Sequence, residues 1–452
     1  MTELNDDVLL YIFQVLYYLI TNNEIKYKKS LHSCLFVNKH WYAIMIPILW
    51  RYPSKFVYKN ESLFNIIISH LSDNLIKFLK DKNIIEADFQ KQKLLFNYVK
   101  FCQYLNDIYK CFPKRSSSLL DEEIYKLFIS ECLSIKRLCS EMLSYPIYKY
   151  PGSNISLSNL SELRLVSSSS YNDFYHELAQ ICRSIEKIYI KLCDDLSGAA
   201  ELIEMQKQIK YIYVEESYMN CEKIEQALEK HANSIVSFNI KTHKHFLNDT
   251  LLPKLINLQQ LGIVDNFYEL KHGISYLNYY ELQILELVNV LLDIAIDIIQ
   301  NTNGNLWKIK IRPKDFNQVK EYNQTIHKHC PNIKYVSLFL KDDETLKELE
   351  KIFIKCQHLV AIDISNIPVE LHDKFLDLLV KLAPHTLYKF HIGNIDSFNI
   401  KSLKLFFNDW SYRGRKPLYL YHRERFIGVK EIIRLNYYSD DFWLYGNTWT
   451  DI

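Results

Sequence analysis

The chain has 452 residues, of which 48% are hydrophobic and 24% are charged, and its formal net charge at pH 7 is +2. This length allows two to four domains or one long repeat array, and the composition is that of a folded globular protein. A net charge so close to zero gives no overall attraction to nucleic acid or to an anionic membrane surface. We therefore expect no nucleic-acid and no membrane partner.

The apolar stretch 8–20 is shorter than the roughly 20 residues that a membrane-spanning helix needs. Acidic residues precede it, where a secretory signal peptide carries basic ones. The ten cysteines form no C-x-x-C pair, which favours reduced thiols over disulfides. Together these features predict a protein of the cytoplasm, the nucleus or both.

Residues 1–52 have the periodicity of a small helical head. Apolar residues recur at helical spacing in two adjoining rows, which are Val8, Ile12 and Leu16, then Leu9, Phe13 and Ile20. Asn5 is placed to cap this helix, with two aspartates in the first turn. A second helix is predicted to carry Leu31, Leu35, Asn38 and Trp41 along one face. Pro47 is expected to end or redirect it.

The residues of this head also resemble a known family. Residues 4–9, Ile12-Phe13, residues 33–41 and 47–50 are similar to the F-box, especially to the fungal variety that ends in Pro-Ile-Leu-Trp. This resemblance implies three short helices that dock onto a Skp-type adaptor, which bridges to a cullin–RING ubiquitin ligase. Asn5 stands where the family usually has proline, and Asn38 stands where many members have cysteine or a small residue.

An adaptor-facing surface follows from the same resemblance. The matched positions that would contribute to it are Leu4, Val8, Leu9, Ile12, Phe13, Val37 and Trp41. Some of these residues must pack inside the head, and the sequence does not divide the two groups. Periodicity alone, without the resemblance, favours a helical cap on the domain that follows.

Residues 53–130 are predicted to form a helical connector, with helices over Ser62–Leu79 and Phe89–Cys111 and a loop from residue 113 to 118. No residue pattern in this segment indicates chemistry. The terminal repeats of a solenoid need a covered edge. We therefore expect the connector to cap the array that follows it.

Residues 131–452 repeat a six-residue apolar phrase, L-x-x-L-x-L, at intervals of 23 to 28 residues. Its ten instances begin at Leu160, Ile185, Ile209, Ile235, Leu258, Leu282, Leu306, Ile333, Leu359 and Leu387. Phrase and interval resemble those of leucine-rich repeats. Each phrase ends in a period-2 strand and most gaps hold a helical pattern, so stacked units predict a parallel sheet with helices outside it. A doubly wound α/β domain is the alternative, but it would need no fixed interval.

We accordingly predict an α/β fold. A three-helix F-box and a helical connector precede a leucine-rich-repeat solenoid of about ten to twelve units, with its strands on the concave side and its helices on the convex side. Cys182, Cys330 and Cys356 each stand three residues before a phrase, and Cys132 stands three residues before a weaker copy of it at Ile135 and Leu138. At these positions a small buried thiol is favoured over a metal ligand.

The sequence carries none of the common catalytic motifs. The chain has no G-x-S-x-G and no Walker loop, and the pattern H-E-x-x-H that begins at His176 fails because Gln180 stands at its closing position. We therefore expect a protein that is not an enzyme, with no cofactor and no bound metal.

Strand side chains alternate, so every second residue of a phrase points away from the core. The residues predicted to form a target-binding surface there are Lys187, Tyr189, Lys191, Tyr211, Tyr213, Lys241, Lys308, Lys310, Arg312, Tyr335 and Phe339. Tyrosine and arginine are frequent binding hot spots, and the lysines favour an acidic or phosphorylated protein segment. A chain with 33 tyrosines would place some of them there in any case.

These observations predict a substrate-recognition subunit of an SCF (Skp–cullin–F-box) ubiquitin ligase. The head would hold the adaptor, and the repeats would hold an unknown target protein. The alternative is a leucine-rich-repeat interaction scaffold with no link to a ligase.

Overall fold

The computed structural model divides the chain into two compact units. The first contains residues 1–209 and 222–227, and nearly all the other residues form the second. The structure describes residues 5–21, 28–53, 61–105, 118–138, 140–166, 171–191, 197–215, 222–242, 251–265, 277–416, 418–422 and 433–437. The predicted domain boundaries after residues 52 and 130 stay predictions.

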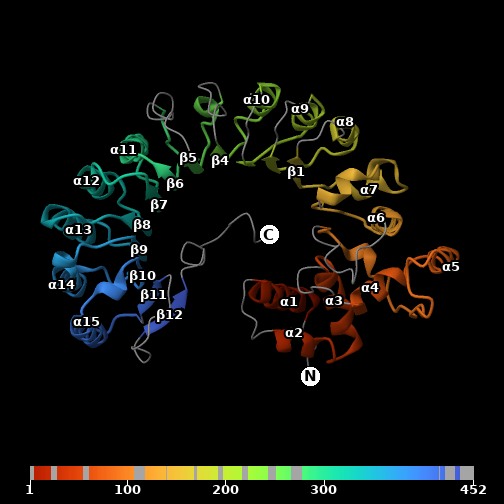
Figure 1. Cartoon of the computed structure of the whole chain (residues 1–452), viewed down its shortest axis with the longest axis horizontal. Coiled ribbons are helices and arrows are strands. Elements are labelled where there is room, and N and C mark those ends of the chain that lie inside the picture. The colour runs from red at the N-terminus through yellow and green to blue at the C-terminus, as the bar shows by residue number, and fades with distance from the viewer. Residues whose placement is uncertain are drawn as a thin grey trace. The chain divides into compact units, whose positions relative to one another are not determined.

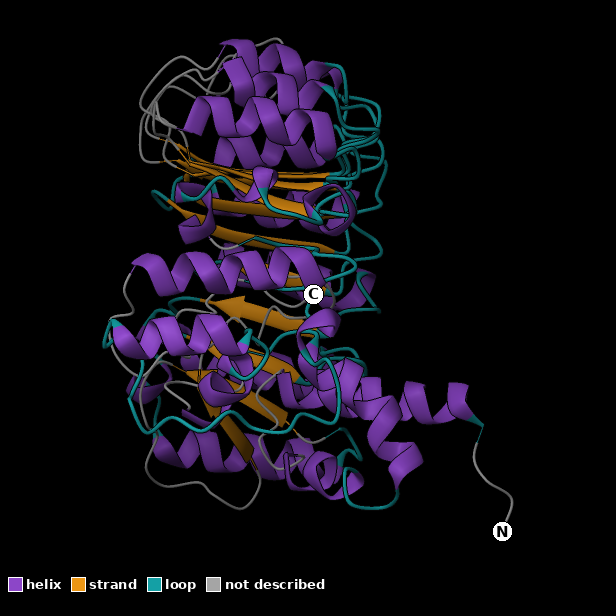
Figure 2. Cartoon of the chain, turned by 90° about the vertical axis from the view of Figure 1, so that its right-hand side faces the viewer, coloured by secondary structure: helices purple, strands orange, loops and turns teal. Residues whose placement is uncertain are grey.

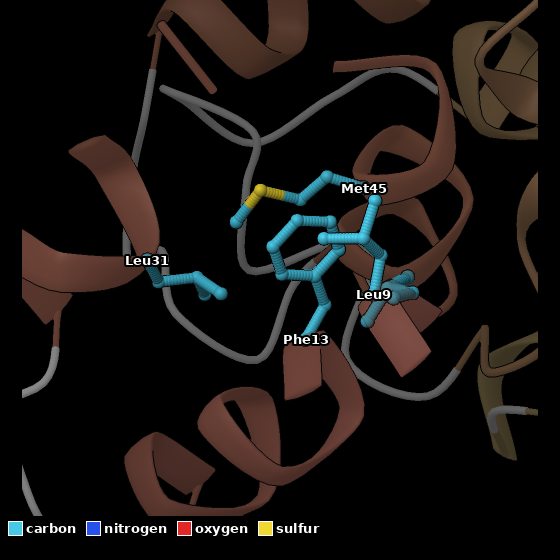
Figure 3. Close-up of a cluster of buried hydrophobic side chains, with 5 residues drawn as sticks. Leu9, Phe13, Leu31 and Met45 are labelled. Atoms are coloured by element: carbon cyan, nitrogen blue, oxygen red, sulfur yellow. The ribbon is translucent and has the colours of Figure 1, made fainter. Parts of the chain in front are cut away.

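The first unit opens with the helices α1 (Asp6–Thr21), α2 (Lys28–Cys34) and α3 (Lys39–Trp50). Asn5 caps α1 as predicted, because its Oδ1 accepts the backbone N–H of Asp7 at 3.1 Å. The three helices enclose a small core formed by Leu9, Phe13, Leu31, Met45 and Ile48 (Figure 3). Burying each such side chain contributes about 1.5–3 kcal/mol, which is what holds so short a head together.

Two predictions about the head are wrong. Asn38 does not lie on the face of a second helix but begins α3, because its Oδ1 accepts the backbone N–H of Trp41 at 2.8 Å. An asparagine bonded in this way starts a helix and competes with its continuation from the preceding residues. Pro47 does not end α3 but lies inside it. The backbone hydrogen bond that proline removes is offset by the burial of Met45 and Ile48 on either side.

The connector contains α4 (Glu61–Ile68), α5 (Asp73–Asp81), the 3₁₀ turn η2 (Val99–Phe101) and α6 (Ser118–Glu131). The predicted helix 62–79 is thus split, with the Ser72 hydroxyl accepting the backbone N–H of Leu75 at the start of α5. The predicted helix 89–111 is wrong as far as the structure describes it, to residue 105. There the backbone bonds to other segments instead, with Tyr98 N–H donating to His70 Nε2 at 3.1 Å.

A backbone ladder joins the head to the first repeats. The carbonyl of Arg51, at the end of α3, accepts the N–H groups of Gln103 and Tyr104. Single bridges then link Tyr104 to Arg137 and Arg137 to Glu162, in parallel. The strands β1 (Glu162–Val166) and β2 (Lys187–Lys191) continue the ladder, and the helices α8 (Asn172–Ile181) and α9 (Ser197–Glu204) follow them. Shorter turns occur at η4 (Ser140–Ser144), η5 (Ile147–Lys149) and α7 (Ser153–Ser156).

The second unit is one parallel sheet whose strands follow each other in chain order. They are β3 (Tyr211–Glu215), β4 (Ser237–Thr242), β5 (Gln260–Asp265), β6 (Ile284–Val290), β7 (Lys308–Pro313), β8 (Tyr335–Leu338), β9 (Ala361–Ile364), β10 (Lys389–Ile392), β11 (Leu418–His422) and β12 (Ile433–Tyr437). The repeat helices are α11 (Leu292–Gln300), α12 (Val319–His329), α13 (Asp343–Lys355), α14 (His372–Leu382) and α15 (Ile400–Tyr412). 3₁₀ turns lie at η7 (Leu252–Lys254), η8 (Val369–Leu371) and η9 (Ile395–Ser397), and α10 (Glu222–Glu229) has residues in both units.

The fold class is confirmed. Strand and helix alternate along the chain, and the helices form a layer on one side of the strands (Figures 1 and 2). All three apolar positions in each of the predicted phrases are at most 3% exposed. Parallel strands that are covered by helices bury this side completely, which is why the phrase is so regular.

The helices form where local signals agree with the repeat. In α13 the side chain of Asp342 accepts the backbone N–H of Thr345, and the Thr345 side chain completes a capping box. Leu349, Ile352 and Phe353 then fall on one face and are buried against the sheet. The helix is thus fixed by its cap and by its apolar stripe together.

Candidate interaction surfaces

Helix α1 has two apolar faces, and only one of them is covered. At 100° per residue, Val8, Tyr11, Ile12 and Val15 fall on one side, which we call the outer face of α1. Their exposed fractions are 45%, 68%, 39% and 39%. An apolar row of this kind on a surface helix is a mark of an interaction site, because water contact with it is unfavourable.

The inner face of α1 holds two of the predicted adaptor-binding residues. Leu9 and Phe13 are buried in the core of the head (Figure 3), and Trp41 is half-buried, with its ring edge-to-face with that of Phe13 at 5.4 Å. The structure thus divides the predicted set: Val8, Ile12 and Val37 are exposed, whereas Leu9 and Phe13 serve the core. Leu4 lies outside the described residues.

The turn between α2 and α3 adds two exposed apolar side chains. Phe36 is 74% exposed and Val37 is 54% exposed. His40, at the start of α3, has its Nε2 atom 2.8 Å from Asp6 Oδ1, which ties this end of α3 to the first turn of α1. The turn therefore lies at the same end of the head as the beginning of the outer face.

Sequence analysis missed Tyr11, Val15 and Phe36. The signal for Tyr11 and Val15 was present, because they stand three and seven residues after Val8 and so share its helix face. Phe36 gave no such signal, since its exposure follows from the break between α2 and α3.

In the first unit, the face of β1 and β2 opposite the helices carries Lys187, Tyr189 and Lys191, all half-buried as the alternation predicts. Lys187 stands beside Glu162 in the register and its Nζ lies 3.5 Å from Glu162 Oε1. Glu162 also accepts the Nε–H of Arg137 at 2.6 Å. Lys187 and Arg137 therefore share the single carboxylate of Glu162. Basic side chains outnumber carboxylates in this part of the face.

In the second unit we call the face of the sheet opposite the helices the open face. Tyr211, Tyr213 and Lys241 point to it and are half-buried. In the register Tyr213 stands beside Asn239, and Lys241 stands beside Glu215. This part of the open face is polar and close to neutral.

Strand β7 places three basic side chains on the open face. Lys308 is buried and its Nζ lies 2.8 Å from Glu286 Oε1, whereas Lys310 is half-buried and Arg312 is exposed. The register sets Lys310 beside Glu286 on β6. Lys308 is thus held by a carboxylate at close range, and Arg312 reaches furthest into solvent.

Two of the predicted aromatic residues, Tyr335 and Phe339, are buried. Tyr335, on β8, is 2% exposed and forms a cluster with Ala361, against which Trp307, Val360 and Tyr419 pack. The prediction for Phe339 is wrong. Strand β8 ends at Leu338, so the alternation stops there, and the Phe339 ring packs against Tyr322 at 5.5 Å instead. Tyr335 is therefore covered by its neighbours and offers no projecting contact on the open face.

Further along the open face lie Asp363 and Lys389, which were not predicted, and His391, which the alternation places there. Lys389, on β10, places its Nζ 5.8 Å from the centroid of the Tyr335 ring. His391 Nδ1 lies 2.6 Å from Asp363 Oδ1, and both side chains are buried. Applying the alternation rule to β9 and β10 as well as to β7 would have found Asp363 and Lys389.

The cysteines of the phrases are structural thiols in the part of the chain that the structure describes. The thiols of Cys132, Cys182 and Cys356 donate to the backbone carbonyls of Val99, Leu157 and Cys330 respectively, and all three cysteines are buried. Burial raises the pKa of the Cys182 thiol to about 12, so it stays protonated.

Among the described residues, no three His, Cys, Asp or Glu side chains lie close enough to hold a metal ion. Nor does any described helix combine the length and apolarity of a membrane span.

No family model and no curated protein matches the chain. Among solved structures, one similar chain comes from the "Crystal structure of Rad7 and Elc1 complex in yeast". The two chains share 15% sequence identity with a TM-score of 0.42, and the match covers 84% of this chain and 98% of that chain. A likeness at this level lends no support to a particular function.

Proposed function

We propose that the protein is a substrate-recognition subunit of an SCF-type ubiquitin ligase. The head binds a Skp-type adaptor, and the repeats bind a target protein. The transfer of ubiquitin belongs to the partners. This chain contributes proximity, because a target held beside the conjugating enzyme has a raised effective concentration.

The observation that supports this proposal is the uncovered outer face of α1. Its residues Val8 and Ile12 are among the positions that match the F-box, while the matched Leu9 and Phe13 complete the core beneath them. A helix that is apolar on both sides has one face for its own core and one for a partner.

Asn5, which replaces the usual proline of the family, does not weaken this proposal. Proline at a first helical position fixes the backbone in advance. Asn5 also stabilises the beginning of α1, because its side-chain oxygen accepts the backbone N–H of Asp7. Asn38 likewise starts α3 and so sets the position of the exposed turn before it.

A scaffold without a ligase is the second candidate, and one observation favours it. The head packs firmly on the connector, where Trp50 stacks on Tyr98 with ring centroids 5.0 Å apart and the Tyr42 and Tyr98 hydroxyls lie 3.1 Å apart. A head that served only to cap the repeats would need this contact but would not need an apolar outer face.

The test is capture of a purified Skp-type adaptor by the full-length protein. We expect capture by the wild type and its loss in Val8→Asp/Ile12→Asp, because two carboxylates would be buried in the interface. The matched control is Leu10→Asp/Gln14→Asp, which adds the same charge to exposed positions on another side of α1. Circular dichroism checks that both variants fold.

Two results would decide against the proposal. Capture that is equal for the two variants would remove the outer face from the interface. No capture by the wild type, under conditions in which a known F-box protein retains the adaptor, would favour the scaffold.

A further inference from the structure

The turn between α2 and α3 sends neighbouring side chains in opposite directions. Cys34 and Leu35 pack against the core of the head, whereas Phe36 and Val37 are 74% and 54% exposed. Among the described residues of α1, α2 and α3, no other large apolar side chain is as exposed as Phe36. The fold thus covers the two residues before Phe36 and leaves its ring in water.

The position of Phe36 is fixed from both sides of the turn. Its backbone N–H donates to the Ser33 carbonyl at 3.1 Å, and its ring centroid lies 4.9 Å from that of the His32 ring. Asn38 fixes the other end of the turn, because it caps α3 by accepting the N–H of Trp41. An aromatic side chain that is already held in place loses little conformational freedom on binding, and this favours affinity.

The surroundings of Phe36 suit an apolar partner surface that continues from the outer face of α1. Residues 33–38 include no charged side chain. Just after them, His40 Nε2 lies 2.8 Å from Asp6 Oδ1, and this contact joins the turn to the first turn of α1. Val37, the neighbour of Phe36, is one of the exposed positions that match the F-box. A partner that covers Val37 and the outer face therefore has Phe36 within its reach.

We infer that Phe36 is the anchor of the adaptor interface and that its ring enters an apolar pocket on the Skp-type adaptor. This inference rests on the proposed function, because it names the residue that contributes most affinity at the same surface. Aromatic residues that fill a pocket in this way are frequent hot spots of protein interfaces. Phe36 is not one of the positions that match the F-box, so it adds a contact of this chain's own to those of Val8, Ile12 and Val37. An adaptor without such a pocket is therefore expected to bind weakly.

The test is isothermal titration calorimetry of the full-length protein with a purified Skp-type adaptor. Phe36→Ala is expected to weaken binding about thirtyfold, which is the scale of a hot spot. Phe36→Leu keeps an apolar side chain and is expected to weaken binding only about threefold. The matched control is Phe78→Ala, which makes the same change on α5, where Phe78 is 43% exposed, and should leave the affinity unaltered.

Two further measurements separate an apolar anchor from other roles. The ratio of the wild-type and Phe36→Ala affinities should be the same in about 0.1 M and about 0.5 M NaCl, because salt screens charges and not apolar contacts. His32→Ala removes the ring beside Phe36 and is expected to weaken binding about threefold. His32→Ala/Phe36→Ala should then bind no more weakly than Phe36→Ala, because His32 acts only by positioning that ring.

Equal affinities of the wild type and Phe36→Ala, or an equal loss in Phe78→Ala, would overturn the inference. The proposed function would still stand if Val8→Asp/Ile12→Asp abolished capture in the same experiment. No binding by the wild type would overturn both. Sedimentation of the samples without adaptor tests a second copy as the occupant. A dimeric wild type with a monomeric Phe36→Ala would assign the ring to that contact and refute the adaptor pocket.

Discussion

Single residues matter most where a charge is buried between repeat helices. Glu348, on α13, is buried and has its Oε2 atom 2.8 Å from His327 Nε2 on α12. Its Oε1 atom accepts from Lys351 at 2.9 Å and from Gln324 at 3.2 Å. Burial by itself would raise the pKa of this carboxyl, but the three hydrogen bonds outweigh it and lower the pKa to about 2. The ionised carboxylate is therefore the form that the fold stabilises.

We predict that Glu348→Gln lowers the free energy of unfolding by about 1–3 kcal/mol at pH 7. The folded-state pKa lies below the ordinary 4.5, so the contribution is complete above pH 4.5 and is lost as the pH falls toward 2. Urea unfolding at pH 7 and at pH 4 should therefore show a smaller difference between wild type and variant at pH 4.

The control for this prediction is Glu344→Gln, which removes an exposed carboxylate from the same helix and is expected to leave the unfolding midpoint nearly unchanged. A difference between wild type and Glu348→Gln that grows on acidification would contradict the account, because it would mean that the neutral carboxyl is the stabilised form.

The residue scale is also where sequence reasoning had its limit. The alternation of side chains along a strand correctly predicted that Lys310 and Arg312 lie on the open face, because a strand fixes the direction of every second side chain. It did not find that Tyr335 would be covered, since that depends on Trp307 and Tyr419 from other repeats. The two-residue period of a strand predicts the direction of a side chain, but the exposure of that side chain depends on neighbours that are distant in the sequence.

Helix α1 has one buried face and one exposed apolar face. Phe13 fills the core of the head, so we predict that Phe13→Ala destabilises the head by about 3–5 kcal/mol. Ile12→Ala removes an exposed side chain and should change stability by no more than about 0.5 kcal/mol. Pulse proteolysis in urea, with cleavage within residues 5–50 identified by mass spectrometry, measures both. Equal protection of the two variants would mean that the faces are wrongly assigned.

The elements of the array were largely predictable, and those of the head and connector were less so. Each repeat strand has its apolar residues at fixed positions, because helices cover one side of it and stacked neighbours repeat it. The head has no such repetition. Its third helix depends on one cap at Asn38, and α3 runs through Pro47 because buried neighbours offset the lost bond. In the connector, Tyr98 bonds to His70 instead of to its own helix, and nothing local indicates that partner.

At the scale of the molecule, the head is an extension of the repeats within the first unit. The bonds from the Arg51 carbonyl to Gln103 and Tyr104, and the bridges through Arg137 to Glu162, continue from α3 to β1. A partner bound to the outer face of α1 would therefore be held in a fixed relation to the first repeats. Such rigidity is useful to a receptor that must place one bound protein relative to another.

We propose that the outer face of α1 binds an adaptor while the repeats stay available to a target. Hydrogen exchange of the full-length protein, with and without a purified Skp-type adaptor, tests it most directly. The account predicts slower exchange on adaptor binding in residues 8–15 and 36–37, with no change in β3–β12. Protection confined to the strands, or none in α1 at saturating adaptor, would contradict it.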